Sequence, residues 1–208
     1  MSLSCAGSVA CYRPRLKRAP KADAVAQCAP MTTFAHLPLT TVLFDLDGTL
    51  LDTLPDIACA LNRALSDEGL AERPLDEVLA GVGRGAAVLV ERMTLKQPDP
   101  LLRERVLAGF FRHYEALHRR GVSSVRAFAG VPECLTELKA RGFRLAVVTN
   151  KRRDLALRSL EDGGVLDAFE LVVGGDTCRH RKPHPEPLLH TLNAMNLAPS
   201  AALMVGDS

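Results

Sequence analysis

Several features that the sequence lacks narrow its function before any motif is considered. Across 208 residues, no uninterrupted apolar run reaches the roughly 18 residues that a membrane-spanning helix needs. Six cysteines occur without a C-x-x-C pair and without a secretory hydrophobic segment, so neither a disulfide framework nor a zinc ribbon is indicated. We therefore expect a soluble protein that has no membrane partner and resides in the reducing cytoplasm.

Beyond its N-terminus the sequence also lacks an excess of basic residues. The net charge of +2 arises because residues 1–30 carry five basic side chains and one acidic one, whereas the remainder holds 21 basic and 23 acidic side chains. A nucleic-acid-binding domain typically shows a basic patch or stripe. Nucleic acid is therefore not an expected partner.

The first 36 residues are predicted to be a disordered leader, or upstream sequence translated ahead of a true start at Met31. Residues 1–30 are rich in alanine, proline and arginine and show no apolar period. A transit peptide is an alternative, because the segment is basic and poor in acid. The aliphatic face of a presequence helix is absent, however.

Short apolar runs that end in polar or glycine residues predict four buried strands, at residues 42–44, 145–148, 171–173 and 203–205. They alternate with helical patterns at residues 131–141, 154–160 and 186–196. This alternation predicts an α/β fold with a Rossmann-like parallel sheet. Ligands bind outside the carboxyl ends of such strands. The residues that we expect at this edge are Asp45, Asp47, Thr149, Asn150 and Asp207.

Residues 54–126 break the alternation, because they show consecutive helical patterns. The helices are expected at residues 56–68, 75–79, 86–95 and 101–119. We expect an all-helical cap that is inserted into a core of residues 37–53 and 127–208 and covers its first loop as a lid. Residues 81–86 formally match G-x-G-x-x-A, but they follow a predicted helix rather than a strand, so a dinucleotide site is not expected.

Asp45 and Asp47 directly follow the first predicted strand. Two carboxylates held this close repel each other unless a cation or a shared proton offsets the repulsion, so a metal site is indicated. Because side chains alternate along an extended chain, both tend to point to the same side, which suits one as nucleophile and the other as proton donor. Thr49 and Leu50 stand where an EF-hand loop needs an oxygen ligand and then glycine, so a calcium loop is not expected.

Cys178, His180 and His184 form a C-x-H-x3-H pattern later in the sequence. A zinc site of this kind needs a fourth ligand, which the pattern does not supply. A metal site is therefore not expected in this stretch.

The segment DLDGTLLDT at residues 45–53 resembles the first motif of the haloacid dehalogenase superfamily. Thr149-Asn150 is similar to the second motif, Lys182-Pro183 to the third and Gly206-Asp207-Ser208 to the start of the fourth, all in the same order. The fourth motif normally continues to a second aspartate and to further strand and helix. We therefore expect a chain that is truncated at its C-terminus.

The resemblance implies a phosphatase mechanism. Asp45 would attack phosphorus and form an aspartyl phosphate, while Asp47 would protonate the leaving group and then deprotonate water. Mg2+ would be held by the side chains of Asp45 and Asp207 and by the main-chain carbonyl of Asp47. The dehalogenases of the superfamily lack the second acid, so Asp47 favours phosphate-ester hydrolysis over halide displacement.

The resemblance also implies which residues bind the substrate. Thr149, Asn150, Lys182 and Gly48 would surround the phosphoryl group. Arg84, in a glycine-containing cap loop, would contact the substrate carboxylate, although a solvated Arg84 in a flexible connector is an equal alternative.

A small phosphorylated metabolite is the expected substrate, with 2-phosphoglycolate as the first candidate, cleaved to glycolate and phosphate. A sugar phosphate, including N-acetylmuramic acid 6-phosphate, is an alternative, as is phosphoryl transfer of the β-phosphoglucomutase type. A truncated chain that binds phosphate compounds or a partner without turnover is a further alternative. Both a monomer and a homodimer are compatible with the sequence.

Overall fold

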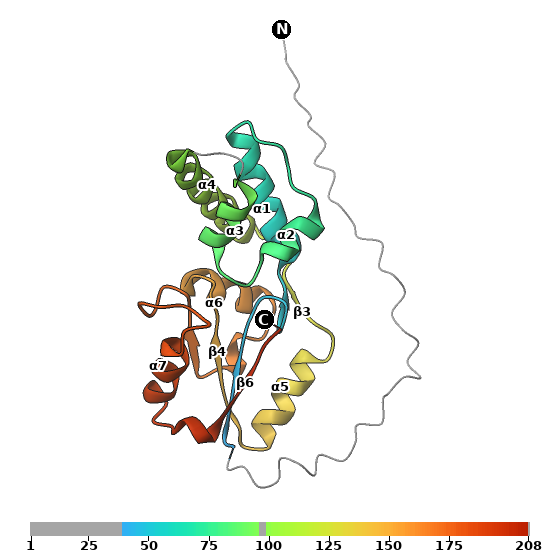
Figure 1. Cartoon of the computed structure of the whole chain (residues 1–208). Helices are drawn as coiled ribbons and strands as arrows, with labels where there is room; N and C mark the ends of the chain where they lie inside the picture. Colours follow the sequence, from blue (N-terminus) through green and yellow to red (C-terminus); the bar gives the residue numbers. More distant parts are fainter. Residues whose placement is uncertain (1–38, 96–98, 208) are drawn as a thin grey trace. The chain divides into compact units, whose positions relative to one another are not determined.

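A computed structural model of the chain describes residues 39–95 and 99–207 (Figure 1). The leader predicted for residues 1–36 lies outside the described residues. Within the described ranges, no helix is long and apolar enough to cross a membrane.

Parallel strands form a central sheet in the order β5-β4-β1-β6. Their bounds are β1 Thr41–Phe44, β4 Arg144–Val148, β5 Leu171–Val173 and β6 Ala202–Val205. Each contains one of the predicted apolar runs, so the predicted α/β class and its parallel sheet are confirmed. Strand β1 lies between β4 and β6, with Phe44 opposite Val147 and Val205. The carboxyl ends of these three strands therefore meet at one edge.

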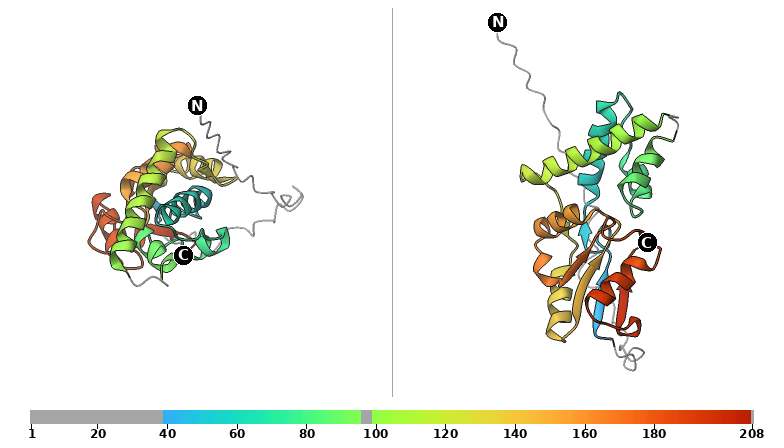
Figure 2. Two further views of the ribbon diagram at one scale, coloured as in Figure 1. Left: turned by 90° about the horizontal axis from the view of Figure 1, so that it is seen from above. Right: turned by 90° about the vertical axis from the view of Figure 1, so that its left-hand side faces the viewer.

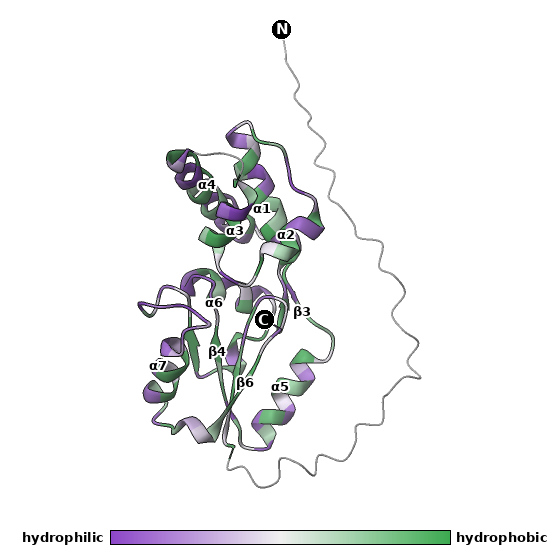
Figure 3. Ribbon diagram, in the orientation of Figure 1, coloured by the Kyte–Doolittle hydropathy of each residue, from purple (hydrophilic) through white to green (hydrophobic). Residues whose placement is uncertain are grey.

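Helices cover both faces of this sheet, which explains why its strands are continuous apolar runs rather than alternating ones. The helices are α5 (Val131–Ala140), α6 (Arg153–Asp162) and α7 (Glu186–Ala194). Phe44 and Val147 pack in the cluster that contains residues of α5 and α6. Leu43 and Ala146 point to the other face, where they pack with residues of α7. Figure 3 shows the hydrophobic strands between helices whose outer faces are hydrophilic.

A separate group of helices forms its own hydrophobic cluster beyond the carboxyl ends of the strands (Figures 1 and 2). They are α1 (Leu54–Asp67), α2 (Leu75–Gly81), α3 (Ala86–Met93) and α4 (Pro100–Arg119). Leu61, Val106 and Phe110 are buried among them, and Leu155 of α6 joins the cluster from the core. The predicted helical insertion is thus confirmed. Its first helix begins at Leu54 rather than at residue 56, with a proline in the first turn.

Two short strands that we did not predict connect the helical insertion to the core. Strands β2 (Leu51–Asp52) and β3 (Arg126–Ala127) pair antiparallel. Nη2 of Arg126 donates to Oδ2 of Asp52 at 2.8 Å. A strand of two residues is too short to show a period-2 pattern in the sequence. This small sheet holds the two connections side by side next to the loop that follows β1.

Candidate active site

Asp45 is the first residue after β1 and is only 4% exposed. Its N–H donates to the carbonyl of Val205 on β6 at 2.9 Å, which places the residue at the carboxyl edge of the sheet. Its Oδ1 accepts the N–H of Leu46 at 2.8 Å. Its Oδ2 pairs with Nζ of Lys182 at 2.8 Å. The fold thus brings together two predicted site residues that are far apart in the sequence.

Asp47 lies on the tight turn after Asp45, in which the N–H of Leu51 donates to the carbonyl of Leu46 at 3.1 Å. Oδ1 of Asp47 accepts from the hydroxyl of Thr53 at 2.6 Å and from Nζ of Lys151 at 2.9 Å. Thr53 occupies the N-cap position of α1, yet its side chain makes no capping bond because its hydroxyl is directed to Asp47. The orientation of Asp47 is therefore held by the residue that precedes α1 and by the loop that follows β4.

Lys151 is a site residue that the sequence analysis missed. Its side chain is 8% exposed, and Nζ donates to the hydroxyl of Tyr114 at 2.7 Å as well as to Asp47. Burial opposes the charged form, but the negative charge of Asp47 and the contact with Tyr114 outweigh burial, so the pKa of Lys151 is raised. Lys151 therefore remains an ammonium group at neutral pH. Its place directly after Thr149-Asn150 was the available signal, but a lysine in a loop is usually solvated.

Tyr114 extends this contact into the helical insertion. It lies on α4 and is fully buried, and its hydroxyl is 3.3 Å from Oγ of Ser159 on α6. Burial raises the pKa of Tyr114, so the hydroxyl is neutral. Tyr114 thus joins α4 to the core beside Asp47, a role that its helical position does not reveal.

Thr149 and Asn150 follow β4 and are both buried. The hydroxyl of Thr149 accepts the N–H of Lys151 at 3.2 Å. Nδ2 of Asn150 donates to the carbonyls of Gly83, in the helical insertion, and of Lys182, at 2.9 and 3.0 Å. Asn150 therefore ties the loop of Gly83 to the loop that carries Lys182. Direct phosphate contact by these residues stays a prediction.

Gly48 allows the carboxylate of Asp207 to approach the loop after β1. Its φ of +81° lies in the left-handed region that favours glycine. A Cβ atom at this position would overlap Oδ2 of Asp207 and lie 3.0 Å from its Cγ. Oδ1 of Asp207 accepts from the hydroxyl of Thr49 at 2.9 Å. The absence of a side chain at position 48 leaves room for the carboxylate of Asp207.

Asp45, Asp47 and Asp207 supply oxygen donors of the kind that Mg2+ prefers. Asp45 directly follows β1, and Asp207 lies just beyond β6, the strand paired with β1. A Cβ atom on Gly206 would lie 3.4 Å from Cβ of Asp45, so the two chain segments are close together. The residues present therefore fit a magnesium ion.

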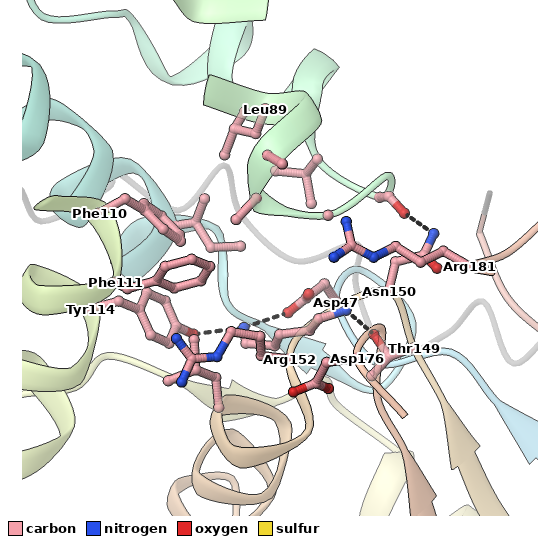
Figure 4. Close-up of a pocket in the computed structure, with 18 of the residues that line it drawn as sticks. Asp47, Leu89, Phe110, Phe111, Tyr114, Thr149, Asn150, Arg152, Asp176 and Arg181 are labelled. Carbon is pink, nitrogen blue, oxygen red and sulfur yellow. Dashed lines mark hydrogen bonds and ion pairs between the residues drawn. The ribbon is translucent and has the colours of Figure 1, made fainter. Parts of the chain in front are cut away.

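A cavity of about 250 Å³ lies between the helical insertion and this edge of the sheet (Figure 4). On the core side it is lined by polar residues, among them Asp45, Asp47, Thr149, Asn150 and Lys151. The helical insertion contributes mostly apolar side chains, among them Ile57, Leu89, Leu107, Phe110 and Phe111. The cavity is therefore charged at its base and apolar at its roof.

Arg84 is exposed and does not line this cavity, so its expected contact with a substrate stays a prediction. Arg181 and Arg152 line the cavity instead. Arg181 donates from Nε to the carbonyl of Gly175 at 2.8 Å. Arg152 is already engaged by Asp154, at 2.6 Å. Arg181 was not among the predicted site residues, although it directly precedes Lys182.

Comparisons with known proteins show the family to which the chain is similar. Residues 42–208 match the family model of haloacid dehalogenase-like hydrolases. The chain is 42% identical over 176 residues to a phosphoglycolate phosphatase of Nitrosospira multiformis, across 83% of this chain and 76% of that protein. It is 41% identical over 174 residues to a plasmid phosphoglycolate phosphatase of Cupriavidus necator, across 83% and 74%.

Solved structures show the same fold. The crystal structure of a predicted phosphoglycolate phosphatase from Haemophilus somnus superposes with a TM-score of 0.75 at 32% identity, and the match covers 83% of this chain and 78% of that one. All the predicted site residues lie within residues 42–208, the range that matches the family model.

Proposed function

The chain belongs to the family of haloacid dehalogenase-like hydrolases, as a phosphoglycolate phosphatase-like phosphatase, and we propose that it hydrolyses a small phosphorylated metabolite in a Mg2+-dependent reaction. We propose 2-phosphoglycolate as its first substrate, cleaved to glycolate and phosphate. The names of the relatives that are 42% and 41% identical support this choice.

The observation that carries the proposal is a pair of carboxylates that share one cavity but have different partners. Asp45 is nearly buried and pairs with Lys182. Asp47 pairs with Lys151 and accepts the hydroxyl of Thr53. Two acids with separate surroundings suit the two roles, nucleophile and proton donor, that phosphate-ester hydrolysis through a covalent intermediate needs.

In the first step, a carboxylate oxygen of Asp45 bonds to phosphorus and the bond from phosphorus to the leaving oxygen breaks, which gives an aspartyl phosphate. Asp47 donates a proton to that leaving oxygen. In the second step, Asp47 accepts a proton from water, whose oxygen bonds to phosphorus and releases phosphate from Asp45. Lys182 supplies positive charge, and Thr149 donates a hydrogen bond to the phosphoryl oxygens from its hydroxyl. Asn150 donates from its main-chain N–H, because its Nδ2 already donates to the carbonyls of Gly83 and Lys182.

Phosphatases of this family generally use Mg2+. Here the carboxylates of Asp45 and Asp207 and the main-chain carbonyl of Asp47 would hold it. When bound, Mg2+ supplies positive charge that offsets the repulsion between an anionic substrate and a carboxylate nucleophile. Gly48 leaves room for the carboxylate of Asp207 beside the loop that follows β1, and its own contact with the phosphoryl group stays a prediction.

We further propose that residues 54–126 act as a cap on a core of residues 37–53 and 127–208. Tyr114 of α4 contacts Lys151 of the core, which links the cap to the acid Asp47. A cytoplasmic location is supported by the described cysteines Cys59, Cys134 and Cys178, none of which forms a disulfide bond. The proposed assembly is a monomer or a homodimer.

The apolar roof of the cavity favours a sugar phosphate as a second candidate substrate. Phe110 and Phe111 offer apolar surface that 2-phosphoglycolate cannot use, whereas a sugar ring can pack against it.

Phosphate release from 2-phosphoglycolate, several sugar phosphates and an aryl phosphate, each with and without Mg2+, tests the proposal. Asp45→Asn is expected to abolish release from every substrate. Asp52→Asn is the matched control, because Asp52 pairs with Arg126 on the small sheet, and it should retain activity. Retained turnover in Asp45→Asn would rule out the nucleophile. Phosphate that moves within the substrate without being released would support the mutase alternative.

A further inference from the structure

The loop that leads into α7 gathers three potential metal ligands outside the cavity. His180, His184 and Glu186 each offer a ligand atom, and these atoms lie within 4.8 Å of one another. Both histidines are exposed and Glu186 is half-buried. None of the three lines the cavity of the candidate active site. No metal site was expected from the C-x-H-x3-H pattern, because Cys178 and the two histidines lack a fourth ligand, but the fold brings Glu186 to the two histidines.

Contacts within the loop already hold these side chains together. Oε2 of Glu186 accepts the main-chain N–H of His180 at 2.8 Å and contacts its Nδ1 at 2.7 Å. The rings of His180 and His184 are stacked, with centroids 4.2 Å apart and planes inclined at 26°. An ion that replaces the proton between Nδ1 of His180 and Oε2 of Glu186 would be bound by both atoms.

The ligand types indicate which cations would bind. Imidazole nitrogens suit Zn2+, Ni2+, Co2+ and Cu2+, whereas Mg2+ prefers oxygen ligands alone. Zinc bonds of about 2.0–2.1 Å place tetrahedral ligand atoms roughly 3.4 Å apart. The three atoms lie within 4.8 Å of one another, so no pair needs to shift by more than about 1.4 Å, which exposed side chains can do. Water can complete the coordination because the cluster is open to solvent.

We propose that His180, His184 and Glu186 form a surface site for a divalent transition-metal cation of the zinc type. The site spans both ends of the loop that carries Arg181 and Lys182. Lys182 contacts Asp45, and Arg181 lines the cavity. An ion at this site would restrain the loop that supplies positive charge to the active site. The site stands on its own ligands and does not depend on the substrate or on the phosphatase mechanism.

Calorimetric titration of the full chain with Zn2+ tests the proposal. The protein is first freed of metal with a chelator and then held in saturating Mg2+, so that oxygen-ligand sites are occupied. His184→Gln and His180→Gln are each expected to weaken Zn2+ binding at least tenfold. His190→Gln is the matched control, because His190 is an exposed histidine on α7 outside the cluster, and it should bind Zn2+ as the unchanged chain does.

Thermal unfolding gives a second readout, because a ligand that binds the folded state raises the unfolding temperature. Zn2+ should raise it in the unchanged chain and in His190→Gln, but not in the double variant with His180→Gln and His184→Gln. Equal unfolding temperatures without Zn2+ would show that the double variant folds. Zn2+ binding that is the same in the double variant as in the unchanged chain, for example through cysteine thiols elsewhere, would overturn the proposal.

Discussion

Replacing Gly48 with alanine tests the proposed role of Asp207 in holding Mg2+. The φ of +81° at Gly48 costs an L-residue about 1–2 kcal/mol. The added Cβ would also overlap Oδ2 of Asp207, so that carboxylate has to move by roughly 1 Å to restore an ordinary contact. A misplacement of about 1 Å in a reacting group lowers rates by roughly 100-fold. We expect kcat to fall by about this factor.

Gly142→Ala separates backbone strain from the displacement of Asp207. Gly142 has a φ of +82° and lies after α5, and a Cβ atom there would meet nothing within 4 Å. Both variants should therefore lose a similar 1–2 kcal/mol, about the cost of the left-handed conformation, from the free energy of unfolding in urea. Gly48→Ala alone should need at least tenfold more Mg2+ for half-maximal activity.

Phosphate release measured over a range of Mg2+ concentrations, at saturating substrate, decides between these outcomes. If Gly48→Ala and Gly142→Ala share the same kcat and the same Mg2+ dependence as the unchanged chain, the close approach of Asp207 is not needed for the reaction. The proposed metal role of Asp207 would then be wrong.

Three further substitutions test the contacts that the fold creates around the cavity. Lys151→Met leaves Asp47 without its cation, so it should lower the free energy of unfolding by about 3 kcal/mol and also reduce kcat. Lys151→Arg should recover part of both the stability and the activity. Equal losses in the two variants would mean that the positive charge is not what matters. Tyr114→Phe removes one hydrogen bond to an ammonium group, so urea unfolding should show a loss of about 1.5–3 kcal/mol, and no loss would contradict the proposed link. Arg181→Ala should raise KM for 2-phosphoglycolate more than Arg84→Ala does, because of these two residues only Arg181 lines the cavity. A larger rise in Arg84→Ala would instead favour the predicted contact between Arg84 and the substrate carboxylate.

The division of the chain into a sheet and a helical insertion could be read from the sequence because burial leaves a local pattern. Strands covered on both faces are continuous apolar runs, and each ends where the chain reaches the polar edge of the sheet. Asp45, Thr149 and Asp207 could be assigned to one edge because the carboxyl ends of parallel strands meet there. The strands β2 and β3 were missed, since two residues cannot display a period.

Local sequence patterns were enough to predict the fold class, the succession of strands along the chain and the acids that follow them. The contacts between charged groups depend instead on how distant elements pack. The pairing of Lys151 with Asp47 and Tyr114 depends on where α4 crosses the core, and the position of Arg181 at the cavity depends on how its loop folds back. Contacts between residues that are distant in the sequence leave no periodic signal, because periodicity records only which face of its own element a residue occupies.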